Sequence, residues 1–215
     1  MSTVTPSPRL TFRPAAASDV DAAVPLIHSS GPAAFEYVFG LPGAGDAQAF
    51  LRHAFVDGSG EFGWRNHVVG ELDGVVVAAG AGYGGATKWP FTLAAARQIL
   101  GHYGWRHAAA VIGRGLKVES VIPPPAGNMY YLAHLGVTPA LRGRGFGAAL
   151  VAHLLEIRPV DAVGPVTLDV ATTNPDAQRL YQRLGFVVIG ERHSRLANPR
   201  GRVPDHRRMR WQAPA

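Results

Sequence analysis

The sequence has no cysteine, only two lysines and no long apolar run. The absence of cysteine excludes disulfide bonds and thiolate chemistry, and with them an acyl-enzyme formed on a thiol. The longest weakly interrupted apolar stretch, residues 75–86, is rich in glycine and too short to span a bilayer. Charged residues make up 17% of the 215 residues and hydrophobic residues 47%, which is typical of a folded chain. This length predicts one domain with a sizeable core.

Signals for secretion and for metal binding are missing as well. Residues 1–8 contain neither the basic segment nor the apolar core of a secretory signal, so we expect a flexible N-terminus, no membrane association and a cytoplasmic protein. No metal site is expected, because metal-ligand spacing is not found among His28, His53, His67, His102, His107 and His153.

Turn residues divide the chain into three regions. In the first, the pattern predicts an extended segment at 9–13, a helix from Asp19, a helix at 46–55 and strands at 67–72 and 75–82. Asp73-Gly74 between the two strands is typical of a hairpin turn. The second region, 84–128, predicts an enlarged helical insertion with helices at 91–100 and 105–116. A proline run closes this insertion.

The third region predicts an alternation of strands and helices. The expected elements are a strand at 129–137, a helix at 145–157, a strand at 166–170, a helix at 175–184 and strands at 186–191 and 208–211. The first strand, helix and strand form a βαβ unit, so we expect these two strands to be parallel.

Three glycines, Gly143, Gly145 and Gly147, lie where the strand at 129–137 leads into the next helix. Glycines there let backbone N–H groups approach an anion, and the helix N-terminus adds partial positive charge. The pattern therefore predicts a phosphate or pyrophosphate site. A P-loop is excluded because no Lys-Ser/Thr follows the last glycine. A dinucleotide fingerprint is formally matched, but too few residues follow it to complete a doubly wound sheet.

Two segments resemble the signatures of the GNAT superfamily of N-acyltransferases. Arg142-x-x-Gly145-x-Gly147, after a Val-x-Pro strand end, resembles the family's loop for the pyrophosphate of acyl-CoA. The run from Asn174 through Tyr181 to Leu-Gly-Phe186 resembles its second signature. The resemblance implies one α/β domain over 9–215 with a mixed, mostly antiparallel sheet. Its one parallel βαβ pair, with strands ending at Val137 and Val170, would be splayed to hold acyl-CoA.

The resemblance also implies the binding residues for acetyl-CoA. In the family the Asn174 side chain faces the pantetheine arm, and the Tyr181 hydroxyl faces the thioester sulfur. The full set is Leu135, Gly136, Val137, Arg142, Gly143, Arg144, Gly145, Phe146, Gly147, Ala148, Asn174, Ala177 and Tyr181. Local patterns offer another interpretation, in which Asn174 is only a helix N-cap before Pro175 and Tyr181 only a buried aromatic residue.

Acyl transfer to an amine needs a base, a donor for the thioester oxygen and an acid for the leaving thiolate. Tyr181 is the candidate acid, and a backbone N–H of residues 135–137 the oxygen donor. For the base, the resemblance implies Asp169 or His134, at positions where members of the family place a proton acceptor, or a chain of water molecules as in other members. Asp169 and His134 have the alternative interpretation of structural groups in or near the core. Glu36 and Tyr37 lie where the family wraps the acceptor and are candidates to contact a cationic amine.

The predicted function is transfer of acetyl from acetyl-CoA to a primary amine, on a small molecule or a protein, by direct attack in a ternary complex. One alternative is a non-catalytic acyl-CoA sensor or partner module on the same fold. The other is a nucleic-acid-associated protein that uses its basic C-terminal segment. A homodimer is the expected assembly, as the commonest among oligomers.

The net charge of +6 lies in one stretch, residues 192–210, which holds seven arginines and one acid. Nineteen of the 21 basic residues of the chain are arginine, which indicates compositional bias as much as phosphate recognition. Trp211 is the only aromatic residue beside this stretch, so a base-stacking platform is not indicated. We expect an arginine-rich hairpin or loop beside the active site, acting on an acidic acceptor or on the 3′-phosphate of CoA. Nucleic acid is ranked last as a partner.

Overall fold

The computed structural model describes residues 10–43, 45–160 and 162–213, and the expected flexible segment 1–8 lies outside them. The helices are α1 Val20–Ser29, α2 Pro32–Phe39, α3 Ala47–Asp57, α4 Lys88–Val118, α5 Phe146–Glu156 and α6 Pro175–Arg183. The strands are β1 Leu10–Pro14, β2 His67–Leu72, β3 Val75–Gly84, β4 Tyr130–Val137, β5 Val166–Ala171, β6 Phe186–Arg192, β7 Ala197–Asn198, β8 Gly201–Arg202 and β9 His206–Trp211.

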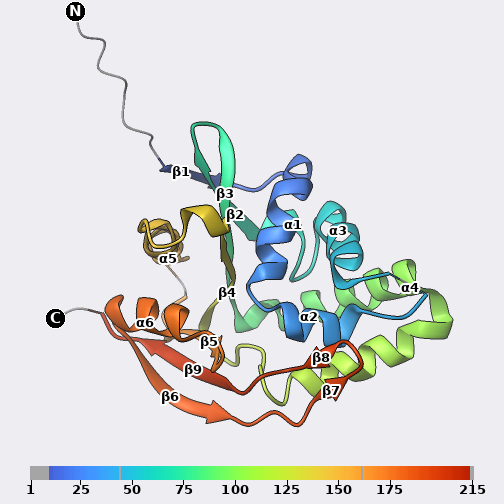
Figure 1. The fold of residues 1–215 in the computed structure, drawn as a ribbon. Coiled ribbons are helices and arrows are strands. Elements are labelled where there is room, and N and C mark those ends of the chain that lie inside the picture. Colours follow the sequence, from blue (N-terminus) through green and yellow to red (C-terminus); the bar gives the residue numbers. More distant parts are fainter. Residues whose placement is uncertain (1–9, 44, 161, 214–215) are drawn as a thin grey trace, which may run out of the picture.

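Seven of the described strands form one mixed sheet in the order β1-β2-β3-β4-β5-β9-β6 (Figure 1). Only the pair β4–β5 is parallel among these neighbours, which confirms the predicted sheet. The predicted hairpin between β2 and β3 is also present. Both turn residues, Asp73 and Gly74, have positive φ values of 52° and 79°, as a type I′ turn requires.

Helices cover both faces of the sheet, with α5 on one side of β4 and α1 and α3 on the other (Figure 1). Side chains alternate along each strand. Ala78 accordingly packs in the cluster of α5 and α6, whereas its neighbour Ala79 packs with α1 and α3. The C-terminal half of α1 packs closely against β4 at Gly136. A Cβ added at Gly136 would lie only 2.2 Å from the carbonyl oxygen of Leu26, so this contact requires glycine. No helix in the described ranges is long and apolar enough to cross a membrane.

The strands β4 and β5 separate soon after they begin to pair. Their register contains only Tyr130↔Val166 and Tyr131↔Thr167, and both strands continue beyond these residues. In addition, β4 carries a bulge against β3 at His134, whose φ is 57°. The separation opens the sheet at its centre, as predicted, and the bulge changes the direction of the His134 side chain at that opening.

One helix of the structure, α2, is not among the predicted elements, although Pro32 is its first residue, a position that proline favours. The two helices expected in the insertion are present as the two parts of α4, which is kinked where the backbone is non-helical at Gly104. The arginine-rich segment contains the short hairpin β7–β8, as predicted, and Figure 1 shows it beside α2.

Candidate active site

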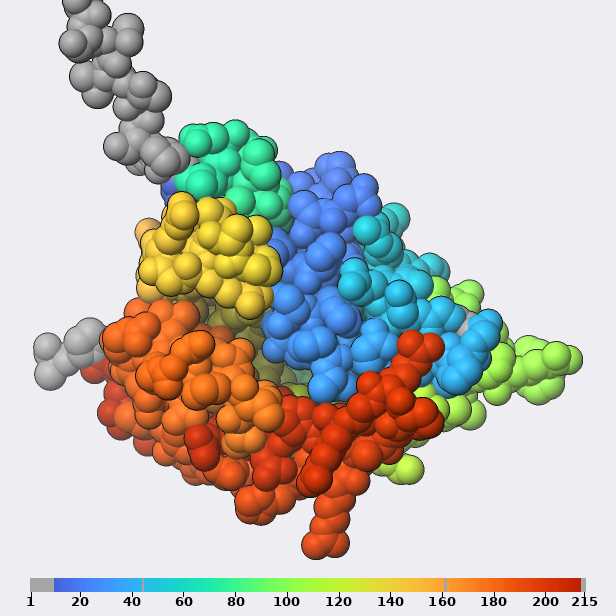
Figure 2. Space-filling view, in the orientation of Figure 1, coloured from blue at the N-terminus to red at the C-terminus, as the bar shows by residue number. Residues whose placement is uncertain are grey.

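A cavity of about 1140 Å³ opens where β4 and β5 separate. Figure 2 shows the hollow between the yellow atoms of α5, the orange atoms of α6 and the blue N-terminal helices. From there the cavity extends to the α1–α2 connection and to α4. Sites for one small ligand occupy roughly 300–1,000 Å³, so this cavity has room for two reactants.

Most of the predicted site residues line this cavity. They are His134, Leu135, Gly136, Val137, Arg142, Gly143, Gly145, Gly147, Ala148, Asp169, Asn174, Ala177 and Tyr181. Four predicted residues are not part of the lining that the described residues form: Glu36, Tyr37, Arg144 and Phe146.

One end of the cavity is suited to an anion. Gly143 and Gly145 have φ values of 76° and 87°, and Gly145 is the N-cap of α5. The first hydrogen bond of the helix runs from the Ala149 N–H to the Gly145 carbonyl, so the preceding N–H groups have no helical partner. Arg142 lies beside them, with its Nε 3.1 Å from the Val137 carbonyl oxygen. This arrangement can bind a pyrophosphate.

Helix α6 forms the adjacent wall. The Oδ1 atom of Asn174 accepts a hydrogen bond of 3.1 Å from the Ala177 N–H, so the residue caps the helix and lines the cavity as well. Tyr181 is only 8% exposed, and burial raises its pKa to about 12. Its phenol therefore keeps its proton at neutral pH and can donate it.

The N–H groups of the three predicted oxygen donors on β4 point in different directions. The Thr138 N–H donates to the Val77 carbonyl of β3 at 2.9 Å. Because successive N–H groups of a strand point to opposite edges, the Val137 N–H faces the open edge and the Gly136 N–H faces β3. Val137 and Leu135, which follows the bulge, remain the candidates.

Asp169 is held in a buried ion pair. Its carboxylate accepts hydrogen bonds from the Arg208 Nη2 at 2.6 Å and from the Tyr131 hydroxyl at 2.9 Å. The side chains of Asp169 and Arg208, which face each other across β5 and β9, are 2% and 9% exposed. Both oxygens of this carboxylate are thus bonded to neighbouring side chains, which is compatible with the structural interpretation of Asp169.

His134 belongs to a chain of hydrogen bonds that determines its tautomer. The His67 Nδ1 lies 2.9 Å from the Gly63 carbonyl oxygen, which can only accept, so this nitrogen carries the proton. The His67 Nε2 then accepts from the His134 Nδ1 at 3.1 Å. Burial and the adjacent His134 lower the pKa of His67 to about 3, so His67 stays neutral. As a result, the His134 Nδ1 carries a proton, and the Nε2 is the ring nitrogen that faces the cavity and Glu61.

A carboxylate faces that nitrogen. Glu61 Oε1 lies 3.6 Å from the His134 Nε2 and accepts a hydrogen bond of 2.7 Å from the Tyr83 hydroxyl. Burial favours a raised pKa for Glu61, but the interactions with His134 and Tyr83 outweigh it and hold the pKa below its usual value. A charged Glu61 stabilises a proton that His134 takes up. Sequence reasoning missed Glu61, His67 and Tyr83, which no local motif marks.

We expect this histidine pair to make stability depend on pH. As the pH falls from 7 to 5, His67 of the unfolded chain takes up a proton near its ordinary pKa of 6.5, whereas the folded protein does not. Unfolding is then favoured, by about 2 kcal/mol at pH 5. Urea unfolding of wild type and of His67→Gln at both pH values measures this contribution. Equal pH dependence in the two proteins would contradict it.

Glu36 and Tyr37 connect elements away from the cavity. The Glu36 carboxylate lies 3.4 Å from the Arg200 Nη1 and 3.3 Å from the Ala47 N–H. Tyr37 is buried in the cluster of α2, α3 and α4. Glu36 therefore joins α2 to the hairpin β7–β8 and to α3, and the structure does not bring either residue to the reacting centre.

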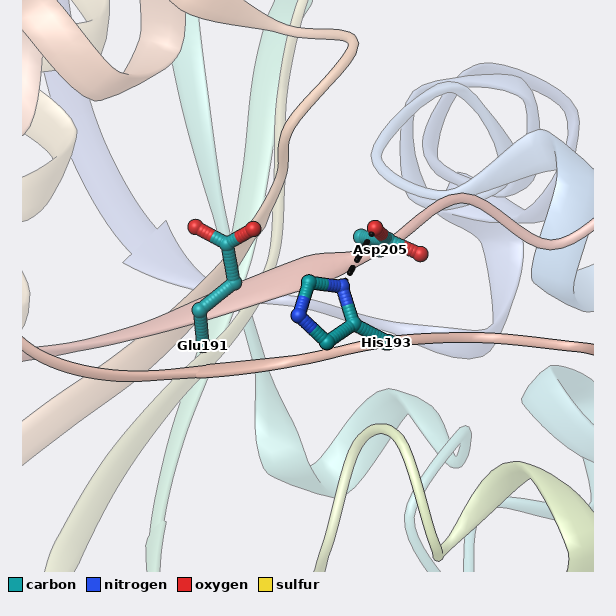
Figure 3. A group of neighbouring side chains, drawn as sticks. All are labelled: Glu191, His193 and Asp205. Atoms are coloured by element: carbon teal, nitrogen blue, oxygen red, sulfur yellow. Dashed lines mark hydrogen bonds and ion pairs between the residues drawn. The ribbon is translucent and has the colours of Figure 1, made fainter.

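Glu191, His193 and Asp205 form a group with potential metal ligands within 4.8 Å of one another, at the ends of β6 and β9. Figure 3 shows the His193 ring directed at Asp205, and their distance is 2.9 Å. Glu191 in turn accepts a hydrogen bond of 2.7 Å from the Arg207 Nε. These existing bonds and the neighbouring guanidinium oppose a cation, and the group lies outside the cavity lining.

Several curated proteins are similar to part of the chain. N-alpha-acetyltransferase RimI of Mycobacterium tuberculosis is 36% identical over 93 residues, which are 42% of this chain and 55% of RimI. The 5-NmdU N-acetyltransferase of Pseudomonas phage PaMx11 is 32% identical over 91 residues, 41% of this chain and 61% of that protein. An uncharacterized protein of Mycobacterium leprae is 33% identical over 51% of this chain. The chain spans 30% to 61% of the lengths of these relatives.

Solved structures share the fold over nearly the whole chain. An N-acetyltransferase from Staphylococcus aureus Mu50 matches with a TM-score of 0.66 at 17% identity, covering 93% of this chain and 99% of that one. The acetyltransferase yncA from Salmonella typhimurium, solved with acetyl-CoA, has a TM-score of 0.52 at 17% identity and covers 96% and 95%. The family model described as "Acetyltransferase (GNAT) family" matches residues 62–186. The chain belongs to the GNAT acetyltransferase family.

Proposed function

We propose that this protein transfers an acetyl group from acetyl-CoA to a primary amine while both are bound. The observation that carries the proposal is one continuous cavity with three parts in order. An anion site lies at α5, a buried phenol lies at Tyr181, and the Nε2 of His134 lies beside Glu61. The anion site suits the pyrophosphate of acetyl-CoA, and the phenol and the histidine nitrogen match the acid and the base that acyl transfer to an amine requires.

Each group of the site has a separate role in this transfer. Acetyl-CoA supplies the acetyl group as a thioester. The N–H groups at the start of α5 and Arg142 bind its pyrophosphate, and Asn174 and Ala177 border its pantetheine arm. The N–H of Leu135 or Val137 donates to the thioester oxygen as negative charge develops there. As the amine nitrogen bonds to the carbonyl carbon and the C–S bond breaks, His134 takes the amine proton and Tyr181 protonates the thiolate.

The choice of His134 over Asp169 rests on their surroundings. Asp169 is bound by Arg208 and Tyr131, whereas the His134 Nε2 faces the cavity with a carboxylate beside it. In this proposal Asp169 is a structural residue, which stabilises the position of β5 at the opening through its bonds to Arg208 and Tyr131. A water molecule between the amine and His134 is compatible with the same proton path.

Residues 9–215 work as one unit in this proposal, with the insertion 84–128 building the acceptor side. The arginine-rich segment contacts the protein itself, since Arg200 binds Glu36, Arg207 binds Glu191 and Arg208 binds Asp169. These contacts make nucleic acid binding the least supported alternative. Action on an acidic acceptor or on the CoA 3′-phosphate, a cytoplasmic location and a homodimer stay predictions.

Replacing Tyr181 by phenylalanine tests the assigned acid. We expect kcat to fall by about 10²-fold, because the thiolate must leave without a proton. The affinity for acetyl-CoA should change little, since the ring remains in place. Steady-state thiol release and calorimetric titration measure the two quantities. An unchanged kcat would remove Tyr181 from the mechanism, and acetyl-CoA binding without turnover of any amine by the wild type would favour the sensor alternative.

A further inference from the structure

The half of the cavity that lies away from α5 and α6 differs in character from the acetyl-CoA half. Its walls come from the α1–α2 connection, the segment before β2, and the long helix α4 with the proline run that follows it. The side chains that line it from α4 are mostly apolar and include Phe91, Ile99, Val111, Ile112 and Leu116. This half is therefore built mainly from residues that the two signatures do not include.

Aromatic rings surround the reacting centre on this side. Phe62 and Phe35 lie with ring centroids 5.1 Å and 6.0 Å from that of His134, and 5.8 Å from each other. Phe91 packs edge-on against Tyr83 at 5.1 Å. An amine at the His134 Nε2 is thus enclosed by ring faces and edges, and its substituent extends along apolar walls toward α4.

Few charged groups are available to a polar acceptor here. Glu61 faces His134, and Asp169 is already paired with Arg208. The other charged side chains of this lining are Lys88, the first residue of α4, and Glu119, which directly follows α4, and both are exposed. The polar side chains of this half, Ser29, Ser30 and Thr92 with the two charged ends, are few beside the apolar ones. Most further ammonium or hydroxyl groups of a polyamine or an aminosugar would therefore meet apolar walls, which is unfavourable.

We propose that the acceptor is a primary amine attached to an apolar group of at least aromatic-ring size. The inference rests on the proposed acetyl transfer and adds the substrate class. Glu61 attracts the ammonium group before it loses its proton, and Phe35, Phe62 and Phe91 contact the apolar group. The apolar wall continues outward along Ile112 and Leu116, which line the outer part and are 38% and 63% exposed. These two residues determine the length of the substituent that the site prefers.

The test is a matched series of primary amines with thiol release as the readout. Ethylamine, butylamine, hexylamine and phenethylamine form the apolar arm, and spermidine and an aminoglycoside form the polar arm. We expect kcat/KM to rise about fourfold for each added methylene group. Phe-Ala-amide is the peptide arm, because its N-terminal amine carries the same apolar group. The ratio of its kcat/KM to that of phenethylamine shows whether the site prefers a peptide N-terminus or a free amine as the acceptor.

Variants on α4 show where the selectivity arises. In Leu116→Asp the ratio of kcat/KM for hexylamine over ethylamine should fall about tenfold. Leu93→Asp is the matched control, because Leu93 lies on the same helix, is 71% exposed and does not line the cavity. The ratio should be unchanged in this control. Both positions are exposed, so neither change removes a core side chain.

The outcomes separate the substrate class from the acetyl transfer itself. Turnover of the polar amines with a flat apolar series would overturn the substrate class and leave the acetyl transfer standing. If no amine consumes bound acetyl-CoA, the proposed function fails. Calorimetric titration of the apolar amines into the protein with bound CoA then tests the proposed acceptor class separately. Affinity that rises with chain length would support an apolar acceptor site, and equal affinities would overturn it.

Discussion

Replacing His134 by asparagine lowers kcat by about 10²–10⁴-fold and leaves the affinity for acetyl-CoA within about twofold of wild type. The expected loss is the contribution of a positioned base. Asparagine suits the test because it tolerates the positive φ that the bulge imposes at this residue. Steady-state kinetics gives kcat, and calorimetry gives the affinity for acetyl-CoA.

The control for this variant is His107→Asn. His107 is an exposed residue of α4 outside the cavity lining, so kcat should stay at the wild-type value. Full activity of His134→Asn would contradict the assigned base and return the choice to Asp169 or to water. Circular dichroism and urea unfolding of the variant exclude loss of the fold as the cause of a low rate.

Replacing Gly145 by valine lowers the affinity for acetyl-CoA by about 100-fold. The φ of 87° at Gly145 is unfavourable for any residue with a Cβ and most of all for a β-branched one. The N–H groups at the start of α5 then lose their orientation toward the pyrophosphate. Calorimetric titration with acetyl-CoA, and with CoA alone, measures the loss.

Gly74→Val is the matched control for Gly145→Val. Gly74 also has a positive φ, 79°, and a Cβ there meets nothing within 4 Å, but it lies in the β2–β3 turn far from the cavity lining. It should lose stability and keep wild-type affinity for acetyl-CoA. Retained binding in Gly145→Val would remove the anion site from the account.

Features with a local physical cause could be predicted from the sequence. Asp73-Gly74 adopts the backbone of a tight hairpin, and Gly143 and Gly145 adopt the positive φ that an anion loop needs. Asn174 caps α6, as its place before Pro175 indicates. The parallel pair β4–β5 followed from the spacing of strand, helix and strand. Each of these depends on neighbours within a few residues, or on a connection length.

Features that depend on distant contacts could not be predicted in this way. Glu61 lies in the irregular segment before β2, and only the packing of β2, β3 and β4 brings it to His134. His67 occupies an ordinary strand position, and its role comes from the His134 ring beside it. The sequence left Asp169 open between a base and a structural group, because its partner, Arg208, enters the sheet on β9 from a distant part of the chain.

The most direct test of the account follows the acetyl group itself. Acetyl-CoA labelled in its acetyl carbon is incubated with the protein and phenethylamine, and mass spectrometry and thiol titration follow the products. The account predicts labelled N-acetyl-phenethylamine formed in equal amount with free CoA thiol. Thiol release without labelled amide, or bound acetyl-CoA that stays intact with every amine of both arms, would contradict it.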